Sequence, residues 1–340
     1  MMRASRLAAH AGACYPESEC RSCRYCHNSL PQDRLREHER RCATQYGVMQ
    51  KDQQMAIEHS RLELPRHLVN DLQLQALTAV NAAAKKASDA ARPALIARIL
   101  KLGSTILDME QLLEYVRNRA PLLIHLNLDR IADFLKDETG TYKNRFETMT
   151  SGGSTDYSAR VGWESNIFHK VYDSAKPADR VKYGCLSTFS SEFGVFSAYA
   201  YGDSYLVLNN DRVRLRTTFA TSDTSLANVK LATCEYCCHN LMEYTDDELK
   251  RMVRIANGNE HTDDASKASS TYRETQVHGL VSFRNDVDML VINPRHQKNA
   301  AQMKQIEEFT TRYNIAAIPM RTDVPLPAAT RVLPMGTCRK

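Results

Sequence analysis

The sequence lacks the long apolar runs of a membrane protein. No stretch of its 340 residues approaches the roughly 18 apolar residues that a membrane span needs. A secretory signal with an apolar core is missing as well, and no internal repeat is evident. These absences lead us to expect a protein of the cytoplasm or nucleus with no membrane partner.

A strong charge of either sign is also missing. Lys and Arg number 45 and Asp and Glu 40, so the formal net charge is only +5. This balance permits contact with an anionic partner but does not require one. The composition, with 43% hydrophobic residues, suits one large globular domain or two modest ones.

Cysteine, in contrast, is plentiful. Ten cysteines without a secretory signal indicate metal ligands and free thiols in a reducing compartment rather than disulfides. Four candidate ligands have the spacing Cys-x2-Cys-x11-His-x3-Cys: Cys23, Cys26, His38 and Cys42. Zinc binds thiolate and imidazole in a tetrahedron, and residues four apart share one face of the helix expected over 33–42. We predict one structural Zn²⁺.

Other cysteines leave alternatives open. Cys20-x2-Cys23 is an equally good zinc knuckle, although Cys23 and Cys26 leave Leu30 and Leu35 well placed as a small core. A later group could hold a second zinc ion: Cys234, Cys237, Cys238 and His239. That group falls in a helix expected over about 226–245, where such thiols more often pack than bind metal.

Periodicity and composition divide the chain into segments with different expected secondary structure. Helical spacing and an Ala-rich run at 82–91 predict helices that pause at Gly103. Strands are expected over 122–128, 194–201, 204–209, 212–219, 276–283, 287–292 and 314–320, with a helix over 297–313. We expect the α+β fold class, with a disordered N-terminus (1–19), a zinc finger (20–46), a helical segment (50–120), an α+β catalytic domain (121–320) and a tail (321–340).

Three stretches of the α+β domain carry chemistry. Arg145, followed by Ser151 and Gly152, could form a corner that cradles a phosphate, or an ordinary turn. Aromatic and hydroxyl residues over 181–186, 201–205 and 214–219 suit a cleft that stacks a ring and hydrogen-bonds a sugar, or a β core.

The third stretch is a strand with an unusual face. By the strand period of two, one face carries Tyr272, Glu274, Gln276 and His278. Four polar groups on a core-facing strand need a function or extensive hydrogen bonding. The alternative is the solvent face of an edge strand.

The zinc motif resembles the C2HC finger of ubiquitin-binding modules in DNA-repair proteins. Within it Glu39-Arg40-Arg41 matches the usual acidic interval only in part. Residues 20–42 carry six arginines against three acids, a surplus that could equally favour nucleic-acid phosphate.

Residues of about 121–296 resemble a bacterial and fungal family of uncharacterised domains. The shared motifs are, in order, Tyr142–Gly152, Trp163-Glu164-Ser165, Lys182–Leu186, Tyr201–Leu208, Arg216–Phe219, Glu274–Val281 and Asp286–Pro294. Departures are Ser187 where Asn is usual, and Leu280 where Pro follows His-Gly.

The architecture is similar to that of mono-ADP-ribosyltransferases, including those that modify ubiquitin. That resemblance implies NAD as substrate, with its diphosphate held by Arg145 beside Ser151 and Gly152. Tyr201 and Ser204 would line the nicotinamide pocket. Glu274 would stabilise the oxocarbenium-like transition state, with Tyr272 and Gln276 flanking it where many members have Glu-x-Glu.

The leading hypothesis is therefore an NAD-dependent mono-ADP-ribosyltransferase. Its zinc finger would direct it to a protein target related to ubiquitin, with nucleic acid less favoured as a partner. One alternative is a non-enzymatic zinc-finger adaptor that binds protein or nucleic acid. Another is a hydrolase of a nucleotide-like substrate that uses Glu274 and His278.

Overall fold

The computed structural model describes most of the chain after residue 65. The described ranges are 66–129, 139–149, 156–259 and 272–320, together with the backbone of two short strands near the N-terminus. The chain separates into two compact units, Met1–Glu63 and Leu64–Lys340.

In the first unit, a β-hairpin encloses the predicted zinc knuckle in sequence. Strands β1 (Cys20–Ser22) and β2 (Ser29–Pro31) are antiparallel, with Cys20 opposite Pro31 and Ser22 opposite Ser29. Cys23 and Cys26 belong to the connection between the strands, and all four predicted ligands, His38 and Cys42 included, lie outside the described residues. Cys20 is a strand residue.

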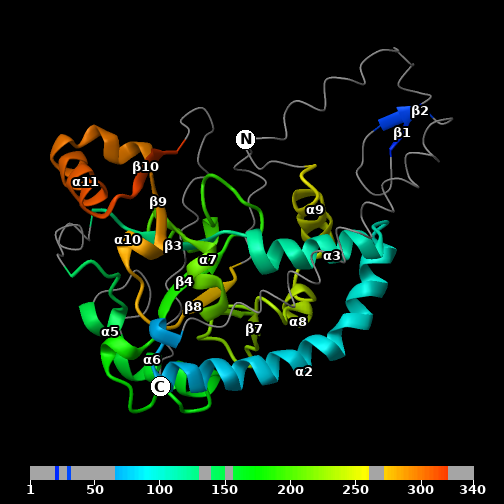
Figure 1. Cartoon of the computed structure of the whole chain (residues 1–340), viewed down its shortest axis with the longest axis horizontal. Coiled ribbons are helices and arrows are strands. Elements are labelled where there is room, and N and C mark those ends of the chain that lie inside the picture. The colour runs from blue at the N-terminus through cyan, green and yellow to red at the C-terminus, as the bar shows by residue number, and fades with distance from the viewer. Residues whose placement is uncertain are drawn as a thin grey trace, which may run out of the picture. The chain divides into compact units, whose positions relative to one another are not determined.

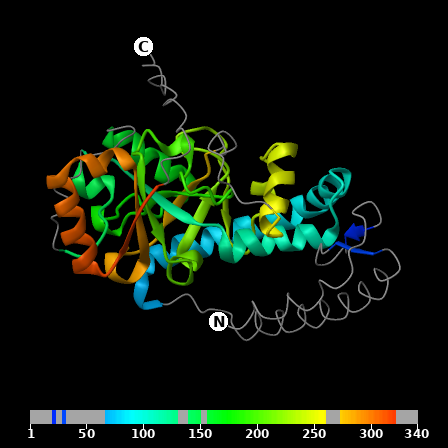
Figure 2. The ribbon, with the colours of Figure 1, turned by 90° about the horizontal axis from the view of Figure 1, so that it is seen from above.

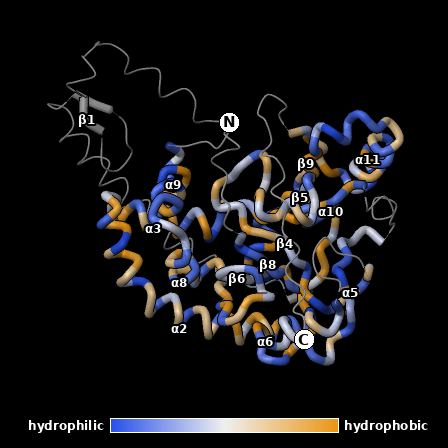
Figure 3. The backbone as a smooth tube through the Cα atoms, turned by 180° about the vertical axis from the view of Figure 1, so that it is seen from behind, coloured by the Kyte–Doolittle hydropathy of each residue, from blue (hydrophilic) through white to orange (hydrophobic). Residues whose placement is uncertain are grey.

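The second unit begins with a long helix, α2 (Asp71–Lys101), which crosses one side of the molecule in Figures 1 and 2. Asn70 and Gln73 form a reciprocal capping box at its start. Its buried residues recur every three or four positions, from Gln73 through Ala84 to Ile99, and Figure 3 shows hydrophobic and hydrophilic residues alternating along it. As predicted, the helix stops before Gly103, whose φ is +84°.

The centre of the second unit is an eight-stranded sheet within the described residues, in the order β10-β9-β5-β3-β4-β8-β6-β7. Every pair is antiparallel except β10 with β9. The strands are β3 (Leu122–Leu126), β4 (Lys182–Leu186), β5 (Ser204–Leu208), β6 (Thr217–Ala220), β7 (Leu231–Thr233), β8 (Glu274–Val277), β9 (Val287–Ile292) and β10 (Ala316–Pro319). The expected mixture of helices and strands is confirmed.

Helices cover the sheet and its two edges. α2 contacts β7 at one edge, and α11 contacts β10 at the other. The remaining helices are α3 (Ile106–Glu114), α5 (Arg145–Thr148), α6 (Tyr157–Ile167), α7 (Asn210–Val213), α8 (Cys238–Leu241), α9 (Asp246–Ala256), α10 (Phe283–Asp286) and α11 (Ala300–Tyr313). A π-helical turn, Tyr115–Arg119, extends α3, and 3-10 turns occupy Arg66–Leu68, Pro177–Asp179, Phe196–Ala198, Arg214–Arg216 and Pro294–Lys298.

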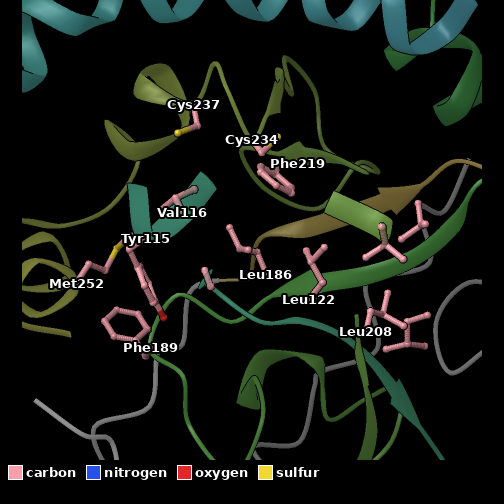
Figure 4. Packing of buried hydrophobic residues seen from close by; sticks show 14 of the residues in the cluster. Tyr115, Val116, Leu122, Leu186, Phe189, Leu208, Phe219, Cys234, Cys237 and Met252 are labelled. Carbon is pink, nitrogen blue, oxygen red and sulfur yellow. The ribbon is translucent and has the colours of Figure 1, made fainter. Parts of the chain in front are cut away.

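The main core lies between one face of the sheet and these helices. Figure 4 shows part of it, with Tyr115, Phe189 and Met252 grouped together. Cys234 and Cys237 lie in the same core, and both are free thiols. Their burial among apolar side chains supports the packing interpretation of these cysteines. Among the described residues no group of three or more His, Cys, Asp or Glu could hold a metal ion.

Most of the strand expected over 276–283 is absent, because β8 ends at Val277 and Phe283 begins α10. Two further predicted elements are wrong. The strand expected over 194–201 is absent: Phe196–Ala198 form a 3-10 turn, several amides of this range bond carbonyls three residues back, and Val195 N donates to His125 Nε2. The helix expected over 226–245 is instead β7 followed by the short α8, since Leu231–Thr233 pairs with β6.

Another element is shorter than predicted. The strand expected over 212–219 begins only at Thr217, because Asn209 caps a helical turn and Arg212 bonds Asp286.

None of the described helices is long and apolar enough to span a bilayer.

Candidate functional site

The polar face predicted for residues 272–278 exists and lies toward the middle of the sheet. β8 has β4 on one side and β6 on the other, so it is not an edge strand. Glu274 lies opposite Cys185 of β4, and Gln276 lies opposite both Tyr183 of β4 and Thr218 of β6. Because directly opposed residues point to the same side of a sheet, these side chains share one face.

Glu274 is held by two hydrogen bonds to one of its oxygens. Thr224 donates from Oγ1 to Oε1 over 2.6 Å, and Gln276 donates from Nε2 to the same atom over 3.1 Å. Oε2 accepts no hydrogen bond from the residues that the structure describes. The side chain is only 5% exposed. Burial raises its pKa from 4.5 to about 8, with the charge of Asp223 adding to the rise.

Two tyrosines lie beside this carboxyl group. The rings of Tyr201 and Tyr272 are stacked, with centroids 6.1 Å apart and planes 23° from parallel. The charge of Glu274 acts on both phenols, and burial raises the pKa of Tyr201 to about 12. The structure therefore brings together four predicted site residues: Tyr201, Tyr272, Glu274 and Gln276.

Arg160 of α6 is the cation whose charge reaches this group. It lowers the pKa of both Glu274 and Tyr201, against the larger effect of burial. Its guanidinium lies over the rings of Trp163 and Tyr183, at 5.9 and 5.8 Å from their centroids. Stacking on aromatic rings holds an arginine guanidinium in a fixed orientation.

A buried ion pair supports the same face. Glu164 of α6 accepts from Arg180 Nη1 over 2.5 Å and from the Tyr183 hydroxyl over 3.0 Å. Burial raises the pKa of Glu164, while Arg180 opposes that rise. The pair ties α6, and with it Arg160, to strand β4.

Gln276 accepts a hydrogen bond of its own from the neighbouring strand β6. Thr218 Oγ1 donates to Gln276 Oε1 over 2.8 Å and lies 3.4 Å from His278 Nε2. His278 Nδ1 is 2.7 Å from the Tyr172 hydroxyl. Tyr172, His278, Thr218 and Gln276 are all buried, so the polar face of β8 is satisfied by hydrogen bonds.

Ser204 lies on the other face of the sheet from Glu274. Glu274 is in register with Cys185, which is opposite Leu123, which in turn is opposite Val207. Ser204 is three residues from Val207 on β5 and so points to the opposite side. Its hydroxyl accepts from Asn293 N over 3.0 Å, a structural bond.

The predicted phosphate corner is only partly described. Arg145 starts α5 and donates from Nη1 to Met149 Sδ over 3.3 Å. Ser151 and Gly152 lie outside the described residues.

Sequence reasoning missed three residues near Glu274: Arg160, Asp223 and Thr224. Arg160 precedes the Trp163-Glu164-Ser165 motif by one helical turn, a spacing that could have placed it beside that motif. Asp223 and Thr224 lie in a loop to which the sequence analysis gave no role. Only the pairing of β6 with β8 brings that loop to Glu274.

The face of β8 also decides against one alternative. His278 is 0% exposed, and burial together with Arg216 lowers its pKa to about 3. It is neutral and enclosed, so it cannot act directly on a substrate as the hydrolase hypothesis requires.

Comparison with known proteins gives a match to one family model and matches to solved structures. The family described as "Protein of unknown function (DUF3626)" matches residues 126–241, which include Arg160 and Tyr201 but not Glu274. No curated protein matches the chain.

Two of the matched solved structures are of one protein from Thermus sp. 2.9. DarT in complex with ADP-ribosylated ssDNA is 9% identical, with a TM-score of 0.32, and the match covers 60% of this chain and 95% of that one. DarT in complex with NAD+ is 9% identical, with a TM-score of 0.31, and the match covers 59% and 94%.

Proposed function

We propose that the second unit is an NAD-dependent ADP-ribosyltransferase with Glu274 as its catalytic residue. The observation that carries the proposal is a buried carboxyl group beside a stacked pair of tyrosines, with the charge of an arginine acting on it. No single one of these groups points to NAD, but together they match the three parts of its reactive end: a cationic ring, a ribose and a diphosphate.

The tyrosine pair suits the nicotinamide. The oxidised nicotinamide ring is flat and positively charged, and the face of a tyrosine attracts both a planar ring and a cation. Tyr201 and Tyr272 present such surfaces in a partly buried environment, where the attraction is stronger than in water.

Glu274 suits the ribose. When the C1′–N bond of NAD breaks, the electron pair leaves with nicotinamide, and positive charge develops on the ribose. A carboxylate beside the ribose stabilises that charge and accepts a hydrogen bond from a ribose hydroxyl. The pKa of Glu274 is raised to about 8 without ligand. The positive charge of a bound nicotinamide ring would lower this pKa and favour the carboxylate.

The diphosphate needs donors and positive charge. We propose Arg145 with Ser151 and Gly152 for this role, as the resemblance implies, and add Arg160 because its charge reaches the Glu274 group. Ser204 is left out of the nicotinamide pocket because it lies on the opposite face of the sheet.

The acceptor is proposed as a macromolecule that the first unit recruits. A structural Zn²⁺ on Cys23, Cys26, His38 and Cys42 would build a finger around the β1–β2 hairpin. We retain a protein acceptor, ubiquitin-related or ubiquitinated, as the first hypothesis. Single-stranded DNA is the second, since DarT has been solved with ADP-ribosylated ssDNA.

The test is transfer of label from NAD. The full chain is incubated with NAD labelled in its adenylate part, together with cell lysate, ubiquitin or single-stranded DNA. We expect label in one macromolecular fraction, and we expect Glu274→Gln to reduce the rate by about 10²-fold or more. Glu235→Gln, at an exposed glutamate, is the matched control and should transfer like the wild type.

Two outcomes would remove the proposal. One is equal transfer by wild type and Glu274→Gln. The other is no cleavage of NAD by wild type under any condition, which would leave the large unit as the binding part of a zinc-finger adaptor.

A further inference from the structure

We propose that Thr218, His278 and Tyr172 are positioning residues for Glu274, linked to it by a one-way chain of hydrogen-bond donors that ends on Glu274 Oε1. The inference rests on the proposed function only in giving Glu274 a catalytic role. The positions of the hydrogens along this chain of hydrogen bonds can be measured without NAD.

The direction of the chain follows from counting hydrogens. A threonine hydroxyl has one hydrogen, and Thr218 uses it toward Gln276 Oε1 at 2.8 Å, with a longer contact of 3.5 Å to Gln276 O. Toward His278 Nε2, at 3.4 Å, Thr218 can then only accept, so Nε2 must carry a hydrogen. His278 is neutral, because burial and Arg216 lower its pKa to about 3. Its Nδ1 is therefore bare and accepts from the Tyr172 hydroxyl at 2.7 Å.

The same logic fixes the amide of Gln276. With Oε1 occupied by the Thr218 hydroxyl, the amide nitrogen is turned toward Glu274 and donates to Oε1 over 3.1 Å. Without Thr218, either end of the amide could face Glu274, and the oxygen would repel a carboxylate. Thr218 therefore selects the orientation in which Gln276 supports an ionised Glu274.

The end of the chain divides the two oxygens of Glu274. Oε1 receives donors from Gln276 and Thr224, whereas Oε2 receives none from the described residues. Oε2 is thus the oxygen left for a ribose hydroxyl, or for the proton when no ligand is bound. The chain would keep this assignment the same in each catalytic cycle.

Packing makes the chain rigid. Tyr172, Thr218, Gln276 and His278 are all 0% exposed. Phe168 packs edge-on against both His278 and Tyr172, with ring centroids 5.2 and 5.1 Å away. A ring enclosed in this way cannot rotate to exchange its nitrogens without opening the core.

The first experiment reads the tautomer of His278. In uniformly ¹⁵N-labelled wild-type protein, the imidazole nitrogen shifts are assigned to His278 by their loss in His278→Gln. We expect a protonated Nε2 and a bare Nδ1 near neutral pH. Finding the hydrogen on Nδ1 would mean that the chain runs the other way and would overturn the proposal.

The second experiment follows the pKa of Glu274 by the ¹³C shift of its carboxyl carbon, titrated across pH 8. The other ionisable groups that act on Glu274 and its tyrosines are Asp223, Arg160, Cys185, Tyr183, Tyr201 and Tyr272, and all are kept. Thr218→Val should raise the pKa by about one unit, since hydrogen bonds to the charged form favour it. Tyr172→Phe should raise it by a smaller amount, because it acts through two further bonds.

Thr217→Val is the matched control. Thr217 is the next residue on β6, points to the other face and bonds Val213 O, so the same substitution there should leave the pKa of Glu274 unchanged. Folding of each variant is checked by its unchanged ¹⁵N spectrum away from the site. A folded Thr218→Val variant with the wild-type pKa would overturn the proposal.

An activity measurement separates this inference from the proposed function. If wild type cleaves NAD, Thr218→Val should lower kcat with little change in KM and shift the pH profile upward. If wild type does not cleave NAD, the proposed function fails, while the tautomer and the pKa still decide whether the chain exists.

Discussion

At the scale of single residues, the site is governed by burial of groups that prefer water. Glu274 shows this most clearly: its pKa rises to about 8, although Thr224, Gln276 and Arg160 all favour its charged form. A carboxyl group balanced in this way near neutral pH can be ionised by the arrival of a positively charged ring beside it. The strand period of two was enough to predict that Glu274 shares one face of β8 with Gln276. The pKa of Glu274 could not be predicted, because Asp223, Thr224 and Arg160 come from distant parts of the chain.

The raised pKa of Glu274 has a consequence for stability. Between pH 4.5 and about 8 the folded protein holds a proton that the unfolded chain releases, so stability falls as the pH rises through this range. A gap of about 3.5 pH units, at ~1.4 kcal/mol per unit, amounts to ~5 kcal/mol at most. Glu274→Gln removes this loss. We expect the variant to be more stable than wild type above pH 8, with the difference shrinking toward pH 4.5.

Urea unfolding of both proteins at several pH values measures this difference. Glu235→Gln serves again as the exposed control, with no pH-dependent change expected. A wild-type stability that stays level, or rises, between pH 5 and 8 relative to Glu274→Gln would contradict the account.

At the scale of elements, the sequence was informative where local rules decide. Helix α2, its stop at Gly103, strand β9 and helix α11 follow from periodicity and caps. The misplaced elements depend on long-range bonds instead. Residues 196–198 bend into a turn beside His125, and 231–233 becomes a strand only because β6 lies alongside. Ser204 was misplaced for a related reason, since the sequence gives no register between β5 and β8.

Gly202 tests how the segment that carries Tyr201 is fixed. Its φ is +150°, and a Cβ there would lie 1.9 Å from the backbone oxygen of Leu126. We expect Gly202→Ala to cost several kcal/mol, roughly 3 or more, because strand β3 cannot move aside. Gly162→Ala, inside α6 with no atom within 4 Å of the added carbon, should instead stabilise by up to ~1 kcal/mol. Thermal unfolding measures whether each substitution lowers or raises the stability. A Gly202→Ala variant as stable as wild type would contradict the described packing.

At the scale of the whole molecule, the chain has two compact units. The second unit holds the large sheet and the Glu274 group, and the first holds the β1–β2 hairpin with the zinc motif in sequence around it. Under the proposed function the second unit would carry the chemistry and the first the recruitment, and separate measurements test these two roles.

Zinc content tests the first unit. We expect about one zinc ion per chain in metal analysis, lost in Cys23→Ser and in Cys26→Ser. Cys20→Ser should keep its zinc, because Cys20 is a strand residue paired with Pro31, about 10 Å of extended chain before position 23. Loss of zinc in Cys20→Ser with retention in Cys26→Ser would favour the other knuckle, and absence of zinc in wild type would remove the finger.

Release of nicotinamide from NAD tests the central claim most directly, since it requires no knowledge of the acceptor. The full chain is mixed with NAD, and free nicotinamide is followed over time for wild type, Glu274→Gln and Glu235→Gln. The account predicts release by wild type and by Glu235→Gln. It predicts that Glu274→Gln reduces the rate by about 10²-fold or more. Release at the same rate by Glu274→Gln would contradict it.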